Sequence, residues 1–297
     1  MDKLLESKEI EVLSNVLISD YSYTRLGGNV DYLAFPANKT QLIRIIEIAK
    51  NEKLPITILG RMSNLIIKDG GIRGVVVILD KISVITVNKN SITAQAGASL
   101  IDVTNYALEN NLTGLEWAAG IPGSVGGAIF MNAGAYGGEI KDVVSKATFL
   151  DLDTLEFLEL DNQQLDFDYR QSVAQNKNYL IFDATFELST GDKLKIKQLM
   201  NEYNYRRIDK QPLEYPSNGS VFKRPTGYYA GKLIMDANLQ GEQIGGAMIS
   251  TKHANFIINL GNASAKDYLG LIELVKKTIL EKDGIQMETE IKTIGED

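Results

Sequence analysis

The chain of 297 residues contains no cysteine and only one histidine, His253. Without cysteine there are no disulfides, thiolate nucleophiles, iron–sulfur clusters or cysteine-bound zinc. A single histidine also excludes a site built from several histidines, so we expect no metal. A Ser-His-Asp triad would have to use His253, and no G-x-S-x-G sequence accompanies it.

A surplus of basic residues is also lacking. The sequence has 31 Lys and Arg against 38 Asp and Glu, which gives a formal net charge of −7. Nucleic-acid binding needs excess cations to neutralise phosphates, so we exclude a nucleic-acid partner. A few local cations can still bind one pyrophosphate inside an acidic protein, so an anionic small substrate stays open.

No apolar run reaches the roughly 20 residues that a membrane span needs. The N-terminal segment, MDKLLESKEIEVLSNVLISD, mixes charged and apolar residues and lacks the apolar core of a signal peptide. We therefore expect no membrane association and a cytoplasmic location. The apolar spacing in this segment favours an amphipathic helix through Leu4, Leu5, Val12, Leu13, Val16 and Leu17.

Helical and strand patterns alternate along the rest of the chain, which predicts an α+β fold. We expect helices at residues 38–51, 100–110, 194–207 and 265–283. Strands are expected at residues 31–35, 56–59, 65–67, 75–79, 83–88, 92–96, 146–151, 156–160, 179–187, 221–222, 247–249, 256–259 and 290–294.

A chain of this length holds more than one small core. We predict two lobes, over residues 1–88 and 89–190, that together form one domain. A second domain is predicted over residues 191–297, with the boundary just before the helix at 194–207. No internal repeat or low-complexity tract is present.

The most unusual segment is Gly114–Gly138, which has eight glycines in 25 residues. Glycine lets the backbone approach a ligand closely, and exposed N–H groups in such a loop can bind a pyrophosphate. The segment is neither a Walker A motif nor a Rossmann fingerprint, because it lacks G-K-[ST] and a strand leading into G-x-G-x-x-G. From glycine content alone, tight turns and close packing explain the segment equally well.

Three segments together resemble the FAD-contacting loops of the UDP-N-acetylenolpyruvoylglucosamine reductases, the MurB family. They are T-R-L-G-G at Thr24–Gly28, G-R-M-S-N at Gly60–Asn64, and A-G-I-P-G-S-V-G-G-A-I-F-M-N-A-G-A-Y-G at Ala119–Gly137. The resemblance implies a two-lobed FAD-binding domain of the vanillyl-alcohol-oxidase/PCMH type, over residues 1–190, and a C-terminal α+β substrate-binding domain. The implied cofactor-binding residues are Arg25, Gly27, Gly60, Ser63, Asn64, Gly120, Gly123, Ser124, Gly126, Gly127, Asn132 and Gly134.

Three further segments are similar to the catalytic motifs of that family: Asp168–Ser172, Ser217–Pro225 and Gly284–Gly295. The resemblance implies that Ser220 protonates C2 of an enolpyruvyl group, and that Arg170 and Glu290 support the enol-like intermediate. It also implies non-covalent FAD, reduced by NADPH at the same site. A separate Rossmann unit is then unnecessary.

The implied substrate is a nucleotide-sugar, UDP-N-acetylglucosamine enolpyruvate, and no obligate protein partner is evident. Cations are needed for its diphosphate. The family pattern places candidate substrate contacts at Tyr169, Lys210, Asn218, Arg224 and Lys232. The short Lys210–Gly219 segment is typical of the more compact, type II architecture of the family.

Two residues have no settled role at this point. Arg61 stands where the family pattern has a smaller residue, and its side chain either pairs with the FAD phosphates or points to solvent. His253 lies in T-K-H-A-N-F, where we expect local hydrogen bonds rather than catalysis.

Two other functions use the same features. An FAD-linked oxidase of alcohols or sugars shares the scaffold, but many such enzymes tether flavin through His or Cys, and His253 lies outside the flavin loops. A nucleotide-sugar-binding regulator without redox activity is the non-enzymatic alternative. The presence of Arg170, Ser220 and Glu290 disfavours the regulator.

Overall fold

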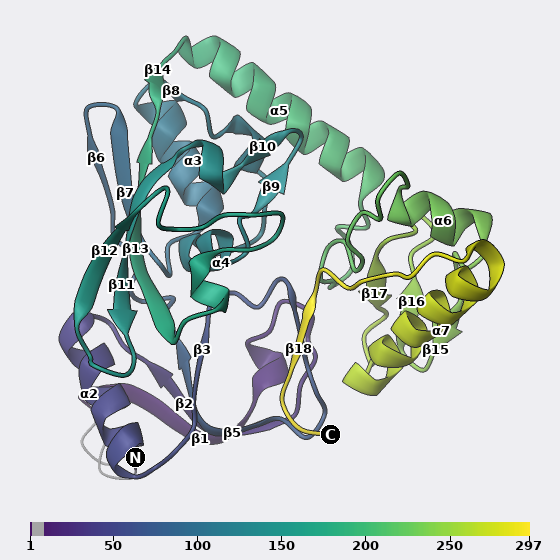
Figure 1. Cartoon of the computed structure of the whole chain (residues 1–297), viewed down its shortest axis with the longest axis horizontal. Coiled ribbons are helices and arrows are strands. Elements are labelled where there is room, and N and C mark those ends of the chain that lie inside the picture. The colour runs from purple at the N-terminus through teal and green to yellow at the C-terminus, as the bar shows by residue number, and fades with distance from the viewer. Residues whose placement is uncertain (2–8) are drawn as a thin grey trace. The chain divides into compact units, whose positions relative to one another are not determined.

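The computed structural model describes Met1 and residues 9–297, and it confirms the α+β class (Figure 1). The helices are α2 (Lys39–Asn51), α3 (Leu100–Glu109), α4 (Val125–Phe130), α5 (Lys193–Lys210), α6 (Ala230–Asp236) and α7 (Ala265–Asp283). The strands of the first two-thirds are β1 (Glu11–Leu17), β2 (Asn29–Phe35), β3 (Ile56–Leu59), β4 (Leu65–Ile67), β5 (Ile72–Ile78), β6 (Ile85–Asn88), β7 (Ser91–Gln95), β8 (Leu112–Thr113), β9 (Gly134–Ala135), β10 (Gly138–Glu139), β11 (Val144–Asp151), β12 (Phe157–Asp161), β13 (Tyr179–Glu187) and β14 (Ser189–Thr190). The remaining strands are β15 (Gln243–Ile244), β16 (Ala247–Ile249), β17 (Ile257–Asn259) and β18 (Lys292–Ile294).

The chain divides into two compact units, each assembled from three segments. The first unit comprises Met1–Leu13, Tyr32–Arg61 and Gly74–Arg207, and the second comprises Ser14–Asp31, Met62–Arg73 and Ile208–Asp297. The predicted division into an FAD-binding domain (1–190) and a substrate-binding domain (191–297) is a functional one and stays a prediction.

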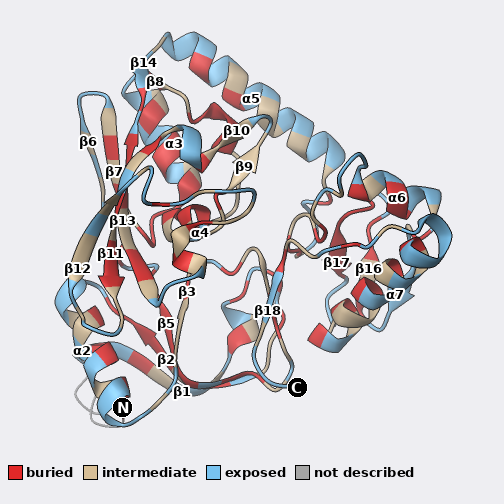
Figure 2. Cartoon of the chain, viewed as in Figure 1, coloured by how far each residue is buried: buried red, intermediate tan, exposed pale blue. Residues whose placement is uncertain are grey.

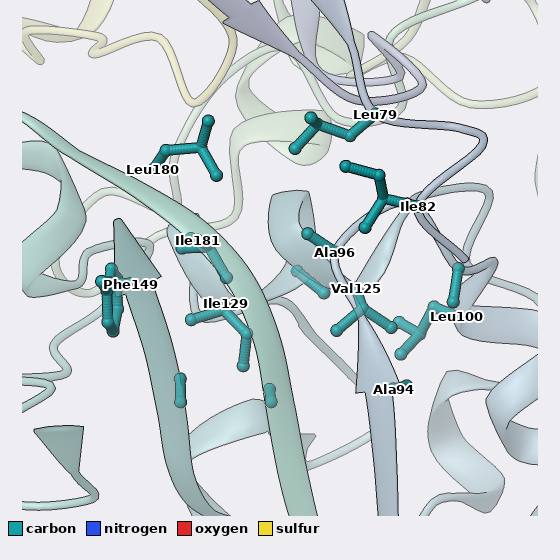
Figure 3. Packing of buried hydrophobic residues seen from close by; sticks show 14 of the residues in the cluster. Leu79, Ile82, Ala94, Ala96, Leu100, Val125, Ile129, Phe149, Leu180 and Ile181 are labelled. Atoms are coloured by element: carbon teal, nitrogen blue, oxygen red, sulfur yellow. The ribbon is translucent and has the colours of Figure 1, made fainter. Parts of the chain in front are cut away.

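A five-stranded antiparallel sheet, in the order β12-β11-β13-β7-β6, forms the centre of the first unit. β7 alternates buried and half-buried residues, as expected for a strand with one face on a core, whereas β11 and β13 also carry runs of buried residues. Helices α3 and α4 contact this sheet. Ile129 and Val125 of α4 pack there among Ala94, Phe149 and Ile181 (Figure 3).

A second sheet, in the order β1-β2-β5-β3, contributes most of its residues to the first unit, together with α2. Asn38 begins α2 as the N-cap, and its side-chain oxygen accepts a hydrogen bond from the Gln41 amide. Leu42, Ile45, Ile46 and Ala49 form the buried face of α2, at the helical spacing that predicted it.

The second unit is built on α7 and the small antiparallel sheet β15-β16-β17. A capping box between Ser264 and Asp267 starts α7, and Gly284 ends it in the left-handed conformation. The buried residues of α7 recur along one side of the helix (Figure 2). β18 pairs in parallel with β4, which places the C-terminal segment beside the segment that follows Met62.

Helix α5 is longer than predicted and mostly exposed (Figure 2). Only Ile196 and Met200 are buried, and they pack with Ala119 and Leu108 in the first unit. The part of α5 up to Arg207 therefore belongs to the first unit, which also contains the five-stranded sheet.

Several predicted elements have the bounds expected, among them β3, β4, β13, β16 and α7. The N-terminal helix is wrong for residues 11–17, which form β1, and its Leu4 and Leu5 lie outside the described residues. Over so short a segment the apolar residues fit the helical period and the strand period equally well. Hydrogen bonding to β2 makes the segment a strand. Residues 221–222 make a single bridge rather than a strand.

Among the described residues, no helix is both long and apolar enough to cross a membrane.

Candidate functional site

The glycine-rich segment, predicted to be a loop, contains a short helix, α4. Ser124 begins the helix as its N-cap, and its hydroxyl accepts a hydrogen bond from the Gly127 amide at 3.3 Å. The amides of Val125 and Gly126 donate to the carbonyls of Ala98 and Ala96. These bonds fix the segment to the end of β7 and hold its shape.

Close packing within the protein explains Gly126 and Gly138 of this segment, and also Gly60. A Cβ atom on Gly126 would lie 3.0 Å from the Ala96 Cβ, and one on Gly138 would lie 2.3 Å from the Trp117 ring. A Cβ on Gly60 would come within 2.3 Å of the Ser124 hydroxyl. The packing interpretation therefore holds for these three positions.

Gly127 and Gly137 differ from the glycines above. The nearest atom to a Cβ on Gly127 is the Ser124 hydroxyl at 3.4 Å, an ordinary contact. Protein packing therefore does not require glycine at position 127, although an interior helix position disfavours glycine relative to alanine. Gly137 needs its positive φ of 91° for the turn between β9 and β10.

The Asp168–Ser172 loop is docked on the C-terminal end of the glycine-rich segment. The Arg170 guanidinium donates to the carbonyls of Gly134 at 3.1 Å and Asn132 at 3.4 Å. The Ser172 hydroxyl donates to the Phe130 carbonyl at 3.0 Å. Two segments predicted separately, one for FAD and one for chemistry, are thus brought together in the first unit.

Arg170 itself adopts a left-handed backbone conformation, with φ of 57°. Such a conformation costs a non-glycine residue roughly 1–2 kcal/mol, so neighbouring contacts must hold it. Gln175 does so, because its side-chain amide donates to the carbonyls of Arg170 at 2.9 Å and Phe130 at 2.8 Å. Gln175 was not singled out in the sequence, which offered no signal for it.

Asn132 is fully buried, and its side chain is committed within the protein. Its amide nitrogen donates to the Glu139 carboxylate and the Asp168 carbonyl, and its oxygen accepts from the Lys141 amide at 3.0 Å. The predicted contact of Asn132 with FAD would therefore have to use backbone atoms. Its side chain instead ties the glycine-rich segment to the Asp168–Ser172 loop.

In the second unit, Ser220 follows a turn at Gly219, whose φ is 74°. The segment is anchored at Ser217, which bridges Ile258 of β17, and at Phe222, which bridges Thr289. Ser220 is half-buried between these two anchors. A turn between two fixed points presents its side chain without the freedom of an ordinary loop.

Glu290 lies beside the Ser220 segment. Its backbone amide donates to the Val221 carbonyl at 2.8 Å, and its carbonyl accepts from the Asn64 side chain at 3.3 Å. The Asn64 carbonyl in turn accepts from the Lys292 amide at 3.1 Å. Three predicted segments, carrying Asn64, Ser220 and Glu290, are therefore neighbours within the second unit.

Asn218 has an unsatisfied polar atom. Its side-chain nitrogen donates to the Leu65 carbonyl, while its buried side-chain oxygen has no hydrogen-bond partner within the part of the chain that the structure describes. Leaving a buried acceptor unpaired costs about 1–3 kcal/mol. Asn218 is 3% exposed, so the missing donor would have to be a bound water or ligand.

The other predicted contacts are mainly on the surface. Arg25 and Lys210 are exposed, and Ser63 is half-buried. Gly27 has φ of 117° and packs closely on Ile18 and Ile67, which accounts for glycine there. In the first unit, Tyr169 is half-exposed beneath the Arg170 guanidinium.

The cations predicted to bind the diphosphate are solvent-exposed residues of the second unit. Arg224 stacks on the Tyr229 ring at 4.0 Å, and Lys232 pairs with Asp236 at 2.7 Å on α6. Exposed pairs of this kind contribute little to stability, so both cations can reorient toward an anion at low cost.

The charge of Arg61 acts on a nearby carboxylate. Burial raises the pKa of Asp80, and the Arg61 guanidinium partly opposes that rise. Arg61 is itself exposed. Its exposure agrees with the alternative in which the side chain points to solvent, and Asp80 is a charged neighbour of the guanidinium.

His253 is held by local hydrogen bonds, as predicted. Its Nδ1 accepts from the Asn255 amide at 3.3 Å, and its own amide donates to the Ser250 hydroxyl at 3.2 Å. Burial lowers the pKa of His253 from its ordinary value of 6.5. The imidazole is therefore neutral at pH 7, which its role as an acceptor requires.

We expect the single imidazole to titrate with a midpoint below 6.5 in the folded protein, because its folded pKa is the lower one. The unfolded chain then binds more protons as the pH falls below about 6.5. The contribution of His253 to stability is complete above that pH and is lost as the pH falls through the folded pKa. Proton NMR of the one histidine measures this directly, with the urea-unfolded chain as reference. A folded midpoint at or above 6.5 would contradict the assignment.

Comparison with known proteins bears on these observations. Residues 30–156 match the family described as "FAD binding domain", and residues 211–294 match "UDP-N-acetylenolpyruvoylglucosamine reductase, C-terminal domain". The chain is 52% identical to the UDP-N-acetylenolpyruvoylglucosamine reductase of Pediococcus pentosaceus, covering 97% of this chain and 96% of the relative. It is 51% identical to the same enzyme of Lactobacillus delbrueckii subsp. bulgaricus, covering 99% and 98%. The crystal structure of the reductase from Thermus caldophilus superposes with a TM-score of 0.82 at 31% identity, covering 96% of this chain and 98% of that one.

Proposed function

Since the chain belongs to the family of UDP-N-acetylenolpyruvoylglucosamine reductases, we propose that its Ser220, Arg170 and Glu290 carry out the reduction of an enolpyruvyl group. The enzyme is an FAD-dependent oxidoreductase of peptidoglycan precursor synthesis. It uses NADPH to convert UDP-N-acetylglucosamine enolpyruvate to UDP-N-acetylmuramate.

The observation that carries this assignment of roles is the hydrogen bonding around Ser220. The Glu290 amide donates to the carbonyl of Val221, the residue after Ser220, at 2.8 Å. The backbone segments that carry the proposed proton donor and the proposed carboxylate are therefore joined directly beside Ser220. General acid catalysis depends on such fixed geometry.

The residues present fit FAD, and the space beside Gly127 supports this. Protein packing does not require glycine at position 127, whereas a ligand lying against the backbone would. We propose that Gly120, Gly123, Ser124, Gly127 and Gly134 hold the cofactor, with Gly60 and Gly126 shaping the segment. Arg25, Gly27, Ser63 and Asn64 are proposed as contacts from the second unit.

The chemistry that FAD supplies when bound is a hydride, received from NADPH and added to C3 of the enolpyruvyl group. Addition at C3 places negative charge on C2 and the adjoining carboxylate. We propose that Arg170 stabilises this charge, since a guanidinium binds carboxylates strongly through paired hydrogen bonds. Glu290 orients the enol-like group, and Ser220 protonates C2.

The substrate contacts are proposed on charge and burial. Arg224, Lys210 and Lys232 are exposed cations in the second unit that can meet the diphosphate. Asn218 has a buried oxygen that accepts an N–H or O–H group of the nucleotide-sugar. Tyr169 is proposed to lie against the substrate from beside Arg170.

We propose the cytoplasm as the place of action, because NADPH and UDP-sugars are both produced there. The proposal needs no protein partner, nucleic acid or membrane. The family assignment argues against the two alternatives, a sugar oxidase and a non-catalytic regulator.

The experiment that tests the function is an anaerobic spectrum of the holoenzyme. NADPH is expected to bleach the flavin absorbance, and UDP-N-acetylglucosamine enolpyruvate is expected to restore it. A flavin that bleaches but ignores this sugar would move the search to another acceptor. Protein that binds no FAD would overturn the assignment of the glycine-rich segment.

Two neighbouring glycines provide a matched test of the cofactor contact. Gly127→Ala is expected to leave the apoprotein as stable as the wild type, or up to about 1 kcal/mol more stable, because alanine is the better helix former. The new methyl group makes only ordinary van der Waals contact within the protein. It should therefore weaken FAD binding, and we expect the Kd for FAD to rise at least about tenfold.

Gly126→Ala is the control for that variant. Its Cβ would lie 3.0 Å from the Ala96 Cβ, so the apoprotein is expected to be less stable than Gly127→Ala by about 1–2 kcal/mol. Thermal unfolding and FAD titration measure both effects. Unchanged FAD affinity in Gly127→Ala would show that Gly127 does not approach the cofactor.

A further inference from the structure

Asn255 makes contacts that none of the roles above uses. The residue is 7% exposed and follows His253 in the turn between β16 and β17. Its side-chain nitrogen donates to the Phe222 carbonyl, and its side-chain oxygen accepts from the Phe222 amide, both at 3.0 Å. One amide side chain therefore satisfies both polar groups of a buried backbone residue.

The backbone of Asn255 adds a third bond to the same segment. Its carbonyl accepts from the Val221 amide at 2.8 Å. Val221 and Phe222 are the two residues that follow Ser220, and both are buried. Asn255 thus replaces a neighbouring strand along this stretch, which is too short and irregular to pair as one.

The opposite side of the same segment holds the C-terminal residues. The Val221 carbonyl accepts from the Glu290 amide, and the Lys223 amide donates to the Glu288 carbonyl at 2.9 Å. Val221 therefore lies between Asn255 and Glu290. A shift of Val221 would displace Ser220 along the chain and Glu290 through this hydrogen bond.

The turn that carries Asn255 is itself well fixed. The Ser250 hydroxyl accepts from the amides of Lys252 and His253, at 3.1 and 3.2 Å. The Phe256 amide donates to the His253 carbonyl at 2.9 Å, and the two rings lie 4.6 Å apart. Asn255 has little freedom to follow a moving Ser220 segment, so it acts as the fixed point.

We propose that Asn255 is a positioning residue, which sets the places of Ser220 and Glu290 by holding Val221 and Phe222. This inference rests on the proposed function, since it concerns the proton donor of the reduction. Displacing a reacting group by about 1 Å can cost about 100-fold in rate. Both polar atoms of the Asn255 side chain bond to Phe222, so the residue acts through the Ser220 segment and its effect is confined to the step that uses Ser220.

The test measures the two half-reactions of the holoenzyme separately by stopped flow. Asn255→Leu fills the same space but forms neither side-chain hydrogen bond. We expect NADPH to bleach the flavin within about threefold of the wild-type rate, while reoxidation by the enolpyruvyl sugar slows about 10- to 100-fold. Equal slowing of both half-reactions, or no slowing, would overturn the proposal.

Asn255→Asp gives a second reading that does not depend on the stability of the leucine variant. A protonated aspartic acid can still donate to the Phe222 carbonyl and accept from its amide, whereas an aspartate repels that carbonyl. Reoxidation by this variant should therefore approach the wild-type rate at low pH and fall as the pH rises. A profile parallel to that of the wild type would count against the proposal.

Val275→Ala is the matched control for lost stability. Val275 is fully buried in α7 of the same unit and belongs to neither the Ser220 segment nor the turn of Asn255. Its substitution should leave the ratio of the half-reaction rates unchanged; a ratio that shifts as in Asn255→Leu would make the effect one of stability and overturn the proposal. Wild-type enzyme that fails to reoxidise with the sugar would instead overturn the proposed function, before any variant is compared.

Discussion

Ser220→Ala is expected to slow flavin reoxidation by the enolpyruvyl sugar about 10²–10⁴-fold, the contribution of a positioned general acid. Reduction of the flavin by NADPH should stay near the wild-type rate, because hydride transfer from NADPH needs no proton at C2 of the sugar. Stopped-flow absorbance of the two half-reactions under anaerobic conditions makes the measurement. Measuring the reoxidation rate of Ser220→Ala in D₂O adds a check. Without Ser220 another donor must deliver the proton, so this step should limit the rate and the solvent isotope effect should be larger than in the wild type.

The control for Ser220 is Ser217→Ala, three residues earlier in the same segment. Ser217 is buried and anchors the segment through a backbone bridge to Ile258, which alanine preserves. If Ser220→Ala slowed both half-reactions alike, Ser220 would be structural and the acid would lie elsewhere.

Serine is a weak acid, so its alkoxide needs support. Lys223 and Lys232 are two cations of the same unit that could supply this support, and each is paired with a carboxylate. Lys223 lies 3.2 Å from Glu288, and Lys232 lies 2.7 Å from Asp236. Exposed ion pairs of this kind contribute little to stability, so the pairing argues against neither lysine.

Arg170→Met should reduce the rate of reoxidation by about 10²–10³-fold, comparable with the removal of one electrostatic stabiliser of a developing anion. Arg170→Lys should recover little of this. The guanidinium reaches the carbonyls of Asn132 and Gly134 through two different nitrogens, and a lysine ammonium cannot reproduce that planar fork. Single-turnover kinetics with the sugar measures the loss.

Arg206→Met serves as the control for Arg170. Arg206 is an exposed arginine of α5, paired with Glu202, so its replacement removes one positive charge without touching the Asp168–Ser172 loop. Near wild-type reoxidation by Arg170→Lys would mean that charge alone matters and that the forked geometry does not.

The sequence predicted the fold best where a pattern was long. Helix α7 has 19 residues, with its capping box and terminal glycine, and its predicted bounds agree with the structure. Helix α6 was missed because seven residues give too few turns for a helical period to emerge. The N-terminal segment was also too short for its apolar spacing to distinguish a helix from a strand, and only its pairing with β2 makes residues 11–17 a strand.

The site shows the same division. Motif resemblance selected Arg170, Ser220 and Glu290, but it could not separate glycines that pack within the protein from one that leaves space. Gly126 and Gly127 are adjacent in sequence and differ only in what surrounds them. Asn132 was predicted as a ligand contact from its motif, but its side chain forms hydrogen bonds only within the protein. Gln175 and Asn255 required the structure, since the side chain of Gln175 bonds to Phe130 and that of Asn255 to Phe222, both far away in sequence.

The packing of Gly138 against Trp117 has an optical consequence. Trp117 is the only tryptophan of the chain, and its ring nitrogen donates to the Gly114 carbonyl at 3.0 Å. All indole fluorescence of the enzyme therefore originates within the glycine-rich segment. Oxidised flavin absorbs in the range where indole emits, so emission from this one ring should fall as FAD binds and partly recover as the flavin is reduced. The chain thus carries its own spectroscopic reporter of cofactor occupancy and redox state, without a label.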